Sequence, residues 1–151
     1  MERDREAQRE YQREAQLARA AADRRLHPTV PEQQIMSVLA ELGERYRIDY
    51  QREYEIRDAN DRLLTHVDFA WPRDHLAVEV YGPPHYEPFG DPKGDRAEKD
   101  VRRIQTVNSA GWDVLIVYDY EITRDVWIDM VDKVQAFLQE GRGRWPGQEG
   151  E

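Results

Sequence analysis

The stretch LTHVDFAWPRDHLAVEVYG, residues 64–82, decides the fold of this chain. It contains two short runs rich in apolar and β-branched residues, 64–70 and 76–82, joined by WPRDH, and this pattern predicts two antiparallel strands with a hairpin connection. Each run gives one packing position to a carboxylate, Asp68 at the end of the first strand and Glu79 in the middle of the second. Two acids on adjacent strands can hold a divalent cation, and hard oxygen ligands suit Mg²⁺. The pattern therefore indicates a site suited to metal-assisted phosphodiester hydrolysis.

Helices and further strands are expected on both sides of this stretch. Residues 2–25 are nearly all strong helix formers. Thr29 as cap, with Glu32 near the positive end, opens a helix that ends near Gly43. The remaining pattern predicts a strand at 47–57, the two acid-bearing strands, a loop at 82–94, a helix at 95–110, a strand at 112–118 and a helix at 123–139.

This order predicts an α/β fold, more narrowly an α+β domain with a central, mixed four-stranded sheet flanked by helices. We expect a charged helical extension at 1–27, the domain itself at 28–140 and a flexible tail at 141–151. The extension has almost no apolar face, so it is expected to be exposed or packed loosely on a partner. It is either a charged helix without chemistry or an arm that tracks DNA or forms a dimer.

Composition narrows the function further. The chain of 151 residues has no cysteine, which excludes disulfides and thiolate chemistry, and its four scattered histidines argue against zinc. No apolar run approaches the ~20 residues of a membrane span, so a soluble, cytoplasmic protein is expected. The net charge of −9 argues against a sequence-reading DNA binder, but metal-dependent nucleases can be acidic because their metal ligands are acids.

Several motifs, in their order and spacing, resemble one family of nucleases. They are TVPE at 29–32, VDF at 67–69, EVYGPPH at 79–85, Asp100 and Arg103 on a helix, and GWDVL at 111–115. This set resembles the very-short-patch repair endonucleases and related homing endonucleases, within the PD-(D/E)xK restriction-endonuclease-like superfamily. The resemblance covers about residues 29–122. It implies a restriction-endonuclease-like core and a Mg²⁺-dependent endodeoxyribonuclease of bacterial, archaeal or phage origin, which nicks DNA or cuts both strands.

The resemblance assigns metal ligands. Asp68 and Glu79 bind Mg²⁺, with Mn²⁺ as the alternative ion, and the backbone carbonyl of Val80 supplies a third protein ligand. Glu32 then holds a second metal or a coordinated water, although an acid at a helix N-terminus is explained equally well as a cap.

The remaining catalytic roles fall to three further residues. His85 acts as general base or stabilises the leaving oxygen, since histidine titrates near neutral pH. Asp100 orients His85 or a water, and Arg103 neutralises charge on the transferred phosphate.

Tyr81 departs from the family's pattern. The position two residues after Glu79 is Lys in most of the superfamily and Asp in many of the closer relatives. A tyrosine hydroxyl can bind a water or a phosphate but carries no charge. Either His85, Lys93 or Lys99 takes over that duty, or the activity is weak or lost.

Contacts with DNA are expected from the loop at 82–94 and the helix after it. Tyr86 and Phe89 either wedge between bases or close the core beneath the loop, and Lys93 and Lys99 bind phosphate. Two other functions stay open: a non-catalytic DNA-binding or assembly module on the same fold, and a nuclease that acts on RNA or branched DNA. A concerted double-strand cut needs two active sites, so a homodimer through the N-terminal helix is a further hypothesis.

Overall fold

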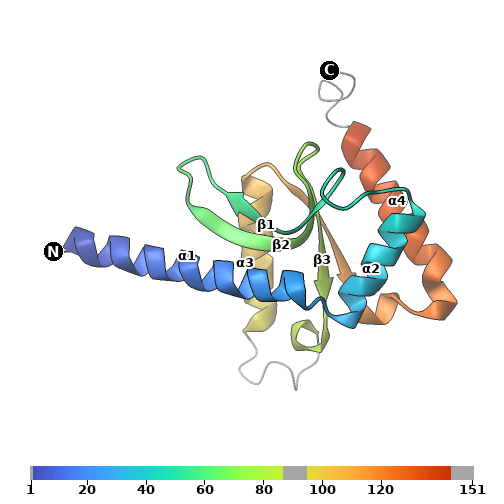
Figure 1. Cartoon of the computed structure of the whole chain (residues 1–151), viewed down its shortest axis with the longest axis horizontal. Coiled ribbons are helices and arrows are strands. Elements are labelled where there is room, and N and C mark those ends of the chain that lie inside the picture. The colour runs from blue at the N-terminus through green and yellow to red at the C-terminus, as the bar shows by residue number, and fades with distance from the viewer. Residues whose placement is uncertain (1, 87–94, 144–151) are drawn as a thin grey trace.

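A computed structural model describes residues 2–86 and 95–143 (Figure 1). Its elements, in chain order, are α1 Glu2–Leu26, α2 Val30–Glu41, β1 Gln51–Arg57, β2 Leu63–Trp71, β3 Leu76–Tyr81, η1 Pro83–His85, α3 Arg96–Ser109, β4 Asp113–Tyr118, η3 Asp119–Glu121, η4 Arg124–Val126 and α4 Trp127–Gly143. The three η elements are single 3₁₀ turns. No helix among these described residues is long and apolar enough to cross a membrane.

The four strands form one mixed sheet in the order β1-β2-β3-β4. β1 pairs with β2, and β2 with β3, in antiparallel fashion, whereas β4 joins β3 in parallel after the crossover through α3. The predicted α+β fold with a mixed four-stranded sheet flanked by helices is therefore confirmed. The hairpin within residues 64–82 is also confirmed, except that Asp68 lies inside β2 rather than at its end.

The helices pack on the sheet through two clusters of apolar side chains. One cluster joins α2 and α4 to the strands, with Phe69 and Val78 facing each other in neighbouring strands. The other packs Val107 of α3 against Ala70 and Ala77, which are also a facing pair. Because side chains alternate along a strand, these two pairs point to opposite faces of the sheet.

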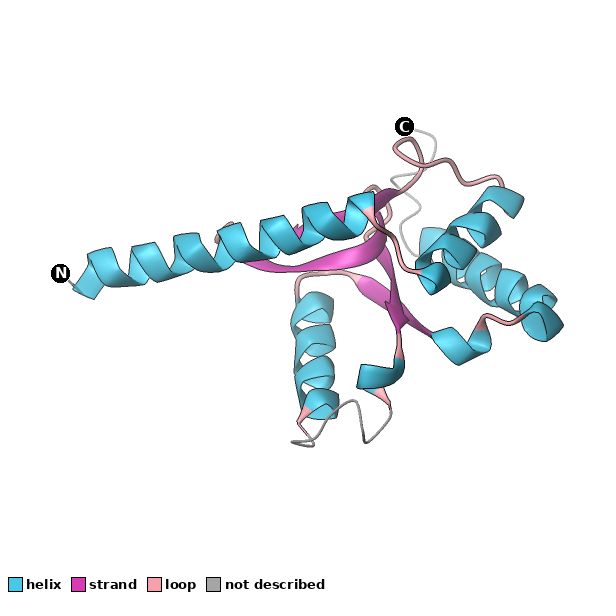
Figure 2. Ribbon diagram, turned by 60° about the horizontal axis from the view of Figure 1, so that its bottom comes forward, coloured by secondary structure: helices cyan, strands magenta, loops and turns pink. Residues whose placement is uncertain are grey.

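The N-terminal helix α1 lies along β1 and β2, across the strands from α3 (Figure 2). Ala21 is its only buried residue, in agreement with the missing apolar face. Arginines attach it instead: Arg13 donates to a β2 carbonyl at 2.6 Å, and Arg52 of β1 donates to the carbonyls of Arg24 and Arg25 at 3.0 Å each. The helix is confirmed and most of its residues are exposed, as expected, while one side of it contacts β1 and β2 of its own sheet.

Two predicted elements have wrong boundaries. Residues 47–50 form no strand, because Asp49 closes a tight turn by accepting the backbone N–H of Arg45 at 2.7 Å, and Ile48 is left exposed. The last helix, predicted at 123–139, begins at Trp127, after the 3₁₀ turn η4, and continues to Gly143. Gly141, which the sequence places in a flexible tail, is buried inside this helix against Leu76, where a Cβ would collide with the leucine side chain.

Candidate active site

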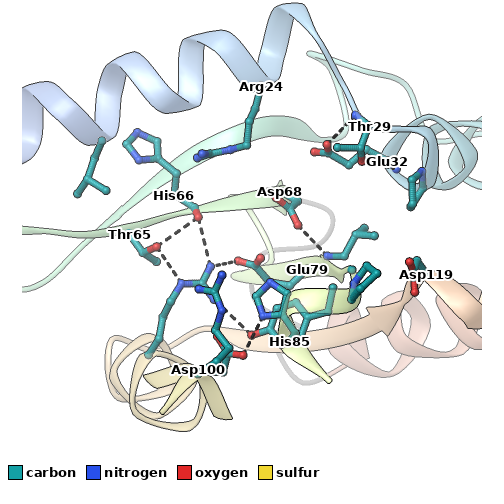
Figure 3. Close-up of a pocket in the computed structure, with 18 residues that line it drawn as sticks. Arg24, Thr29, Glu32, Thr65, His66, Asp68, Glu79, His85, Asp100 and Asp119 are labelled. Carbon is teal, nitrogen blue, oxygen red and sulfur yellow. Dashed lines mark hydrogen bonds and ion pairs between the residues drawn. The ribbon is translucent and has the colours of Figure 1, made fainter. Parts of the chain in front are cut away.

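A cleft of about 720 Å³ opens between α1, α2, the sheet and α3 (Figure 3). Its wall brings together eight of the residues predicted to form the site: Glu32, Asp68, Glu79, Val80, Tyr81, His85, Asp100 and Arg103. Other lining residues were not predicted, and they include Arg24, Thr65, His66, Arg96 and Asp119. Together the described lining residues carry five carboxylates and three guanidinium groups, so the wall has an excess of negative charge.

Asp68 and Glu79 lie side by side in this wall. The register pairs Phe69 with Val78, so Asp68 and Glu79 are the next residues along each strand. Their carboxyl groups are within hydrogen-bonding reach of each other, and the N–H of Val80 donates to Asp68 Oδ2 at 2.7 Å. The convergence on which the nuclease hypothesis depends is therefore present.

Burial makes these carboxylates costly to ionise together. It raises the pKa of Asp68, and it raises that of Glu79 well above the usual range, with the neighbouring Asp68 charge adding to the effect on Glu79. Arg103 of α3 opposes the shift by a direct ion pair with Glu79. Burial lowers the pKa of Arg103, but its contact with Glu79 raises it overall, so the guanidinium stays charged.

Glu32 serves as a helix cap with one oxygen only. Its Oε1 accepts the N–H of Thr29 at 2.9 Å, and Thr29 Oγ1 accepts the N–H of Glu32 at 3.3 Å, which completes a capping box. The other oxygen, Oε2, is buried without a hydrogen-bond partner. The cap hypothesis is thus confirmed, and one oxygen remains for another role.

Glu53 of β1 is an acid that sequence reasoning missed. It falls between the register pairs Arg52–Phe69 and Tyr54–Val67, opposite Asp68, and its backbone has the left-handed φ of +49°. Its side chain is 0% exposed. Oε2 accepts a hydrogen bond from Arg24 Nε at 2.9 Å, whereas Oε1 has no hydrogen-bond partner. Burial and the nearby Asp68 raise the pKa of Glu53 to about 7.

Three of these acids form a compact group of oxygen ligands. One carboxylate oxygen from each of Glu32, Glu53 and Asp68 lies within 4.8 Å of the others. Glu79 is outside this group but contacts Asp68 from the opposite side. The hard oxygens and the partnerless atoms fit a small divalent cation, which the residues around Asp68 could hold.

His85 is held by two neighbours at the other end of the cleft. Its Nδ1 lies 2.8 Å from Asp100 Oδ2, and its ring stacks on Tyr81 with centroids 3.9 Å apart. The carboxylate accepts a hydrogen bond from the Nδ1–H group, so Nε2 is left without a proton and can act as an acceptor. Burial, with Glu79 and Asp100 nearby, raises the pKa of Tyr81, so its hydroxyl stays protonated and neutral.

Two of the residues predicted to contact DNA, Tyr86 and Lys99, are not among the residues that line the cleft. Tyr86 packs against Tyr118 and Tyr120 and donates to Asp119 at 2.5 Å, and Lys99 pairs with Asp95 at 3.2 Å. Phe89 and Lys93 fall in 87–94, outside the described residues.

His66 lines the cleft although no sequence pattern supported it. Its Nδ1 is buried without a hydrogen-bond partner, and burial lowers its pKa. The burial pattern of β2 does not alternate here, since His66 and its neighbour Val67 are both buried, so the sequence offered no periodic signal for His66.

Comparison with family models and with curated proteins finds no match for this chain. Among solved structures, it is similar to the "Homing Endonuclease I-Bth0305I Catalytic Domain". The likeness has a TM-score of 0.48 and 23% identity, over 81% of this chain and 99% of that one. At this level the likeness assigns neither a family nor an activity to the chain.

Proposed function

We propose that this protein is a Mg²⁺-dependent DNA endonuclease. The observation that carries the proposal is the contact between Asp68 and Glu79 in a cleft that also contains the His85–Asp100 pair. The motifs that resemble very-short-patch repair endonucleases support DNA as the substrate. Whether one or both strands are cut, and whether two copies act together through α1, belong to the same proposal.

Asp68 and Glu79, with the backbone carbonyl of Val80, are the proposed ligands of the catalytic ion. A divalent cation bound there supplies positive charge to a phosphoryl oxygen and makes a bound water more acidic. Mn²⁺ has the same preference for oxygen and is expected to substitute. Cation binding would also relieve the repulsion between the two carboxylates, because Arg103 forms an ion pair with Glu79 alone.

His85 is the proposed proton acceptor. Because Asp100 holds Nδ1, the free Nε2 takes a proton from the attacking water, and the imidazolium that forms can then give this proton to the leaving oxygen. Tyr81 holds the ring by stacking, which gives this residue a positioning role in place of the charged residue that most of the superfamily has there. Arg103, with its side chain 29% exposed, remains available to a phosphate at the cleft.

Cleavage of supercoiled plasmid in Mg²⁺ tests the proposal. The wild type is expected to nick or linearise the plasmid, EDTA to stop it, and Asp68→Ala to abolish it. Asp129→Ala, which removes an exposed acid on α4, is the matched control and should cut normally. Mg²⁺-dependent cutting that survives Asp68→Ala would show that another site is responsible.

A non-catalytic DNA-binding module is the second candidate. It is favoured by the ion pair between Glu79 and Arg103, which already neutralises one proposed ligand, and by the uncharged Tyr81. Retention of DNA without cutting, equal in Mg²⁺ and in EDTA, would support this function and count against the first.

A further inference from the structure

We propose that Glu53 of β1 is a ligand of a second divalent-cation site, together with Asp68 and with Glu32, to which the resemblance already assigns a second metal. The use of this site in a reaction rests on the proposed nuclease function, but its existence does not. The site lies on the α1 and α2 side of Asp68, away from Glu79. Asp68 belongs to both sites and is the carboxylate that they share.

The first argument is that three elements deliver one acid each to the same place. Glu32 comes from the first turn of α2, Glu53 from β1 and Asp68 from β2, and their ligand oxygens lie within 4.8 Å of one another. Figure 3 shows Glu32 above Asp68 across the cleft, with Arg24 descending from α1 beside them. Carboxylates gathered from three elements repel one another unless a cation lies between them.

The second argument comes from the individual oxygens. Each acid is fixed by one oxygen: Thr29 N–H binds Glu32 at 2.9 Å, Arg24 binds Glu53 at 2.9 Å, and Val80 N–H binds Asp68 at 2.7 Å. The second oxygens of Glu32 and Glu53 have no hydrogen-bond partner, and these side chains are only 5% and 0% exposed. Buried acceptors without donors are uncommon and costly, and a bound cation would satisfy both.

The neighbouring arginines do not donate hydrogen bonds to the second oxygens of Glu32 and Glu53. Arg52 Nη2 stands 4.0 Å from Glu32 Oε2, beyond hydrogen-bonding distance, and its guanidinium donates to the carbonyls of Arg24 and Arg25 instead. Arg24 reaches only Oε2 of Glu53. Arg24 is thus a partial counterion, which competes with a cation for the same acid.

The backbone of β1 supports the assignment. Glu53 has a φ of +49° within a strand, a conformation that costs a non-glycine residue free energy. Glu53 also falls between two register pairs, Arg52–Phe69 and Tyr54–Val67, and no partner in β2 is assigned to it. The strained backbone brings the carboxylate of Glu53 to Asp68 and Glu32.

Calorimetric titration of the full chain with Mn²⁺, without DNA, tests the inference. We expect two ions per wild-type chain and one for Glu53→Gln. Glu32→Gln keeps the capping oxygen and should weaken the same site by at least about tenfold. Glu55→Gln, which removes an exposed acid two residues along β1, is the matched control and should bind two ions.

Arg24→Gln adds a variant with the opposite sign. It removes the competing charge, so Mn²⁺ should bind this site roughly three- to tenfold more tightly. Damage to the fold cannot produce tighter binding, and thermal unfolding in EDTA checks that each variant is folded. Wild-type stoichiometry and affinity in folded Glu53→Gln, or unchanged affinity in Arg24→Gln, would overturn the inference.

Glu79→Gln separates this inference from the proposed function. One wild-type ion that Glu53→Gln keeps and Glu79→Gln loses would defeat the second site and leave the first intact. One ion that Glu79→Gln keeps and Glu53→Gln loses would support the second site and count against the first. If no ion binds to the wild type, both fail.

Discussion

On the α3 side of Asp68, the buried carboxylate of Glu79 is paired with Arg103, and His85 is held by Asp100 and Tyr81. On the α1 and α2 side, Glu32 and Glu53 each keep a buried oxygen without a partner. On the first side the protein itself pairs Glu79 and His85, whereas on the second side two buried carboxylate oxygens have no hydrogen-bond donor. Buried acids are retained at such a cost where they bind something.

The largest effect is expected from the α3 side, at the proposed proton acceptor. His85→Ala should lower the rate of plasmid cleavage by about 10²–10⁴-fold, which is the usual contribution of general acid–base catalysis. Asp100→Asn should cost less, because the ring keeps its stack on Tyr81. A cleavage rate in His85→Ala within about twofold of the wild type would remove histidine from the proposed mechanism.

The ion pair on the α3 side should be essential to stability. Arg103→Met leaves Glu79 buried without its counterion, and breaking a buried pair in this way typically costs about 3–5 kcal/mol. Urea unfolding at pH 8 in EDTA should show a loss near the lower end of that range, because Glu79 can take up a proton instead. Unchanged stability would mean that the pair contributes little to the fold.

On the α1 and α2 side, substitution of Glu53 is expected to raise the stability of the fold, whereas substitution of Arg103 lowers it. Its pKa is raised to about 7 from 4.5, so the folded state binds the proton more tightly, and stability falls as pH rises between these two values. In EDTA at pH 8, Glu53→Gln should therefore raise the free energy of unfolding by up to about 3 kcal/mol, with little change at pH 4. A less stable variant at pH 8 would contradict the description of this acid as unsatisfied.

The smallest effect is expected at the residue that departs from the family's pattern. Tyr81→Phe keeps the stack on His85 and removes only a hydroxyl that lies 3.5 Å from Arg103 Nη1. Cleavage should change by less than about fivefold, in line with the loss of one weak hydrogen bond. A drop comparable to that of His85→Ala would show that the hydroxyl itself acts on the substrate.

The sequence predicted the α3 side of the site better than the other. Asp68 and Glu79 interrupt apolar runs, and the two-residue period of a hairpin is enough to place them on one face. His85, Asp100 and Arg103 came with the family resemblance. The sheet and three of the four helices also followed from apolar spacing, because burial decides those elements.

Glu53 and the docking of α1 on the sheet were missed for physical reasons. Strand alternation predicts that Glu53 and Glu55 share one side of β1, but Glu55 is exposed whereas Glu53 is buried and has a positive φ, which its sequence does not indicate. The helix α1 docks through arginine side chains and backbone carbonyls, which leave no apolar periodicity to read. Polar docking of this kind depends on the partner surface, and that surface exists only after the sheet has formed.

Asp68 is common to both sides, so cation binding to its variant tests the central claim most directly. Titration calorimetry with Mg²⁺ should detect binding to the wild type and to the control Asp129→Asn, and should detect none to Asp68→Asn at the same concentrations. Binding to Asp68→Asn with wild-type stoichiometry and affinity would contradict the assignment of this cleft as a metal-dependent nuclease site.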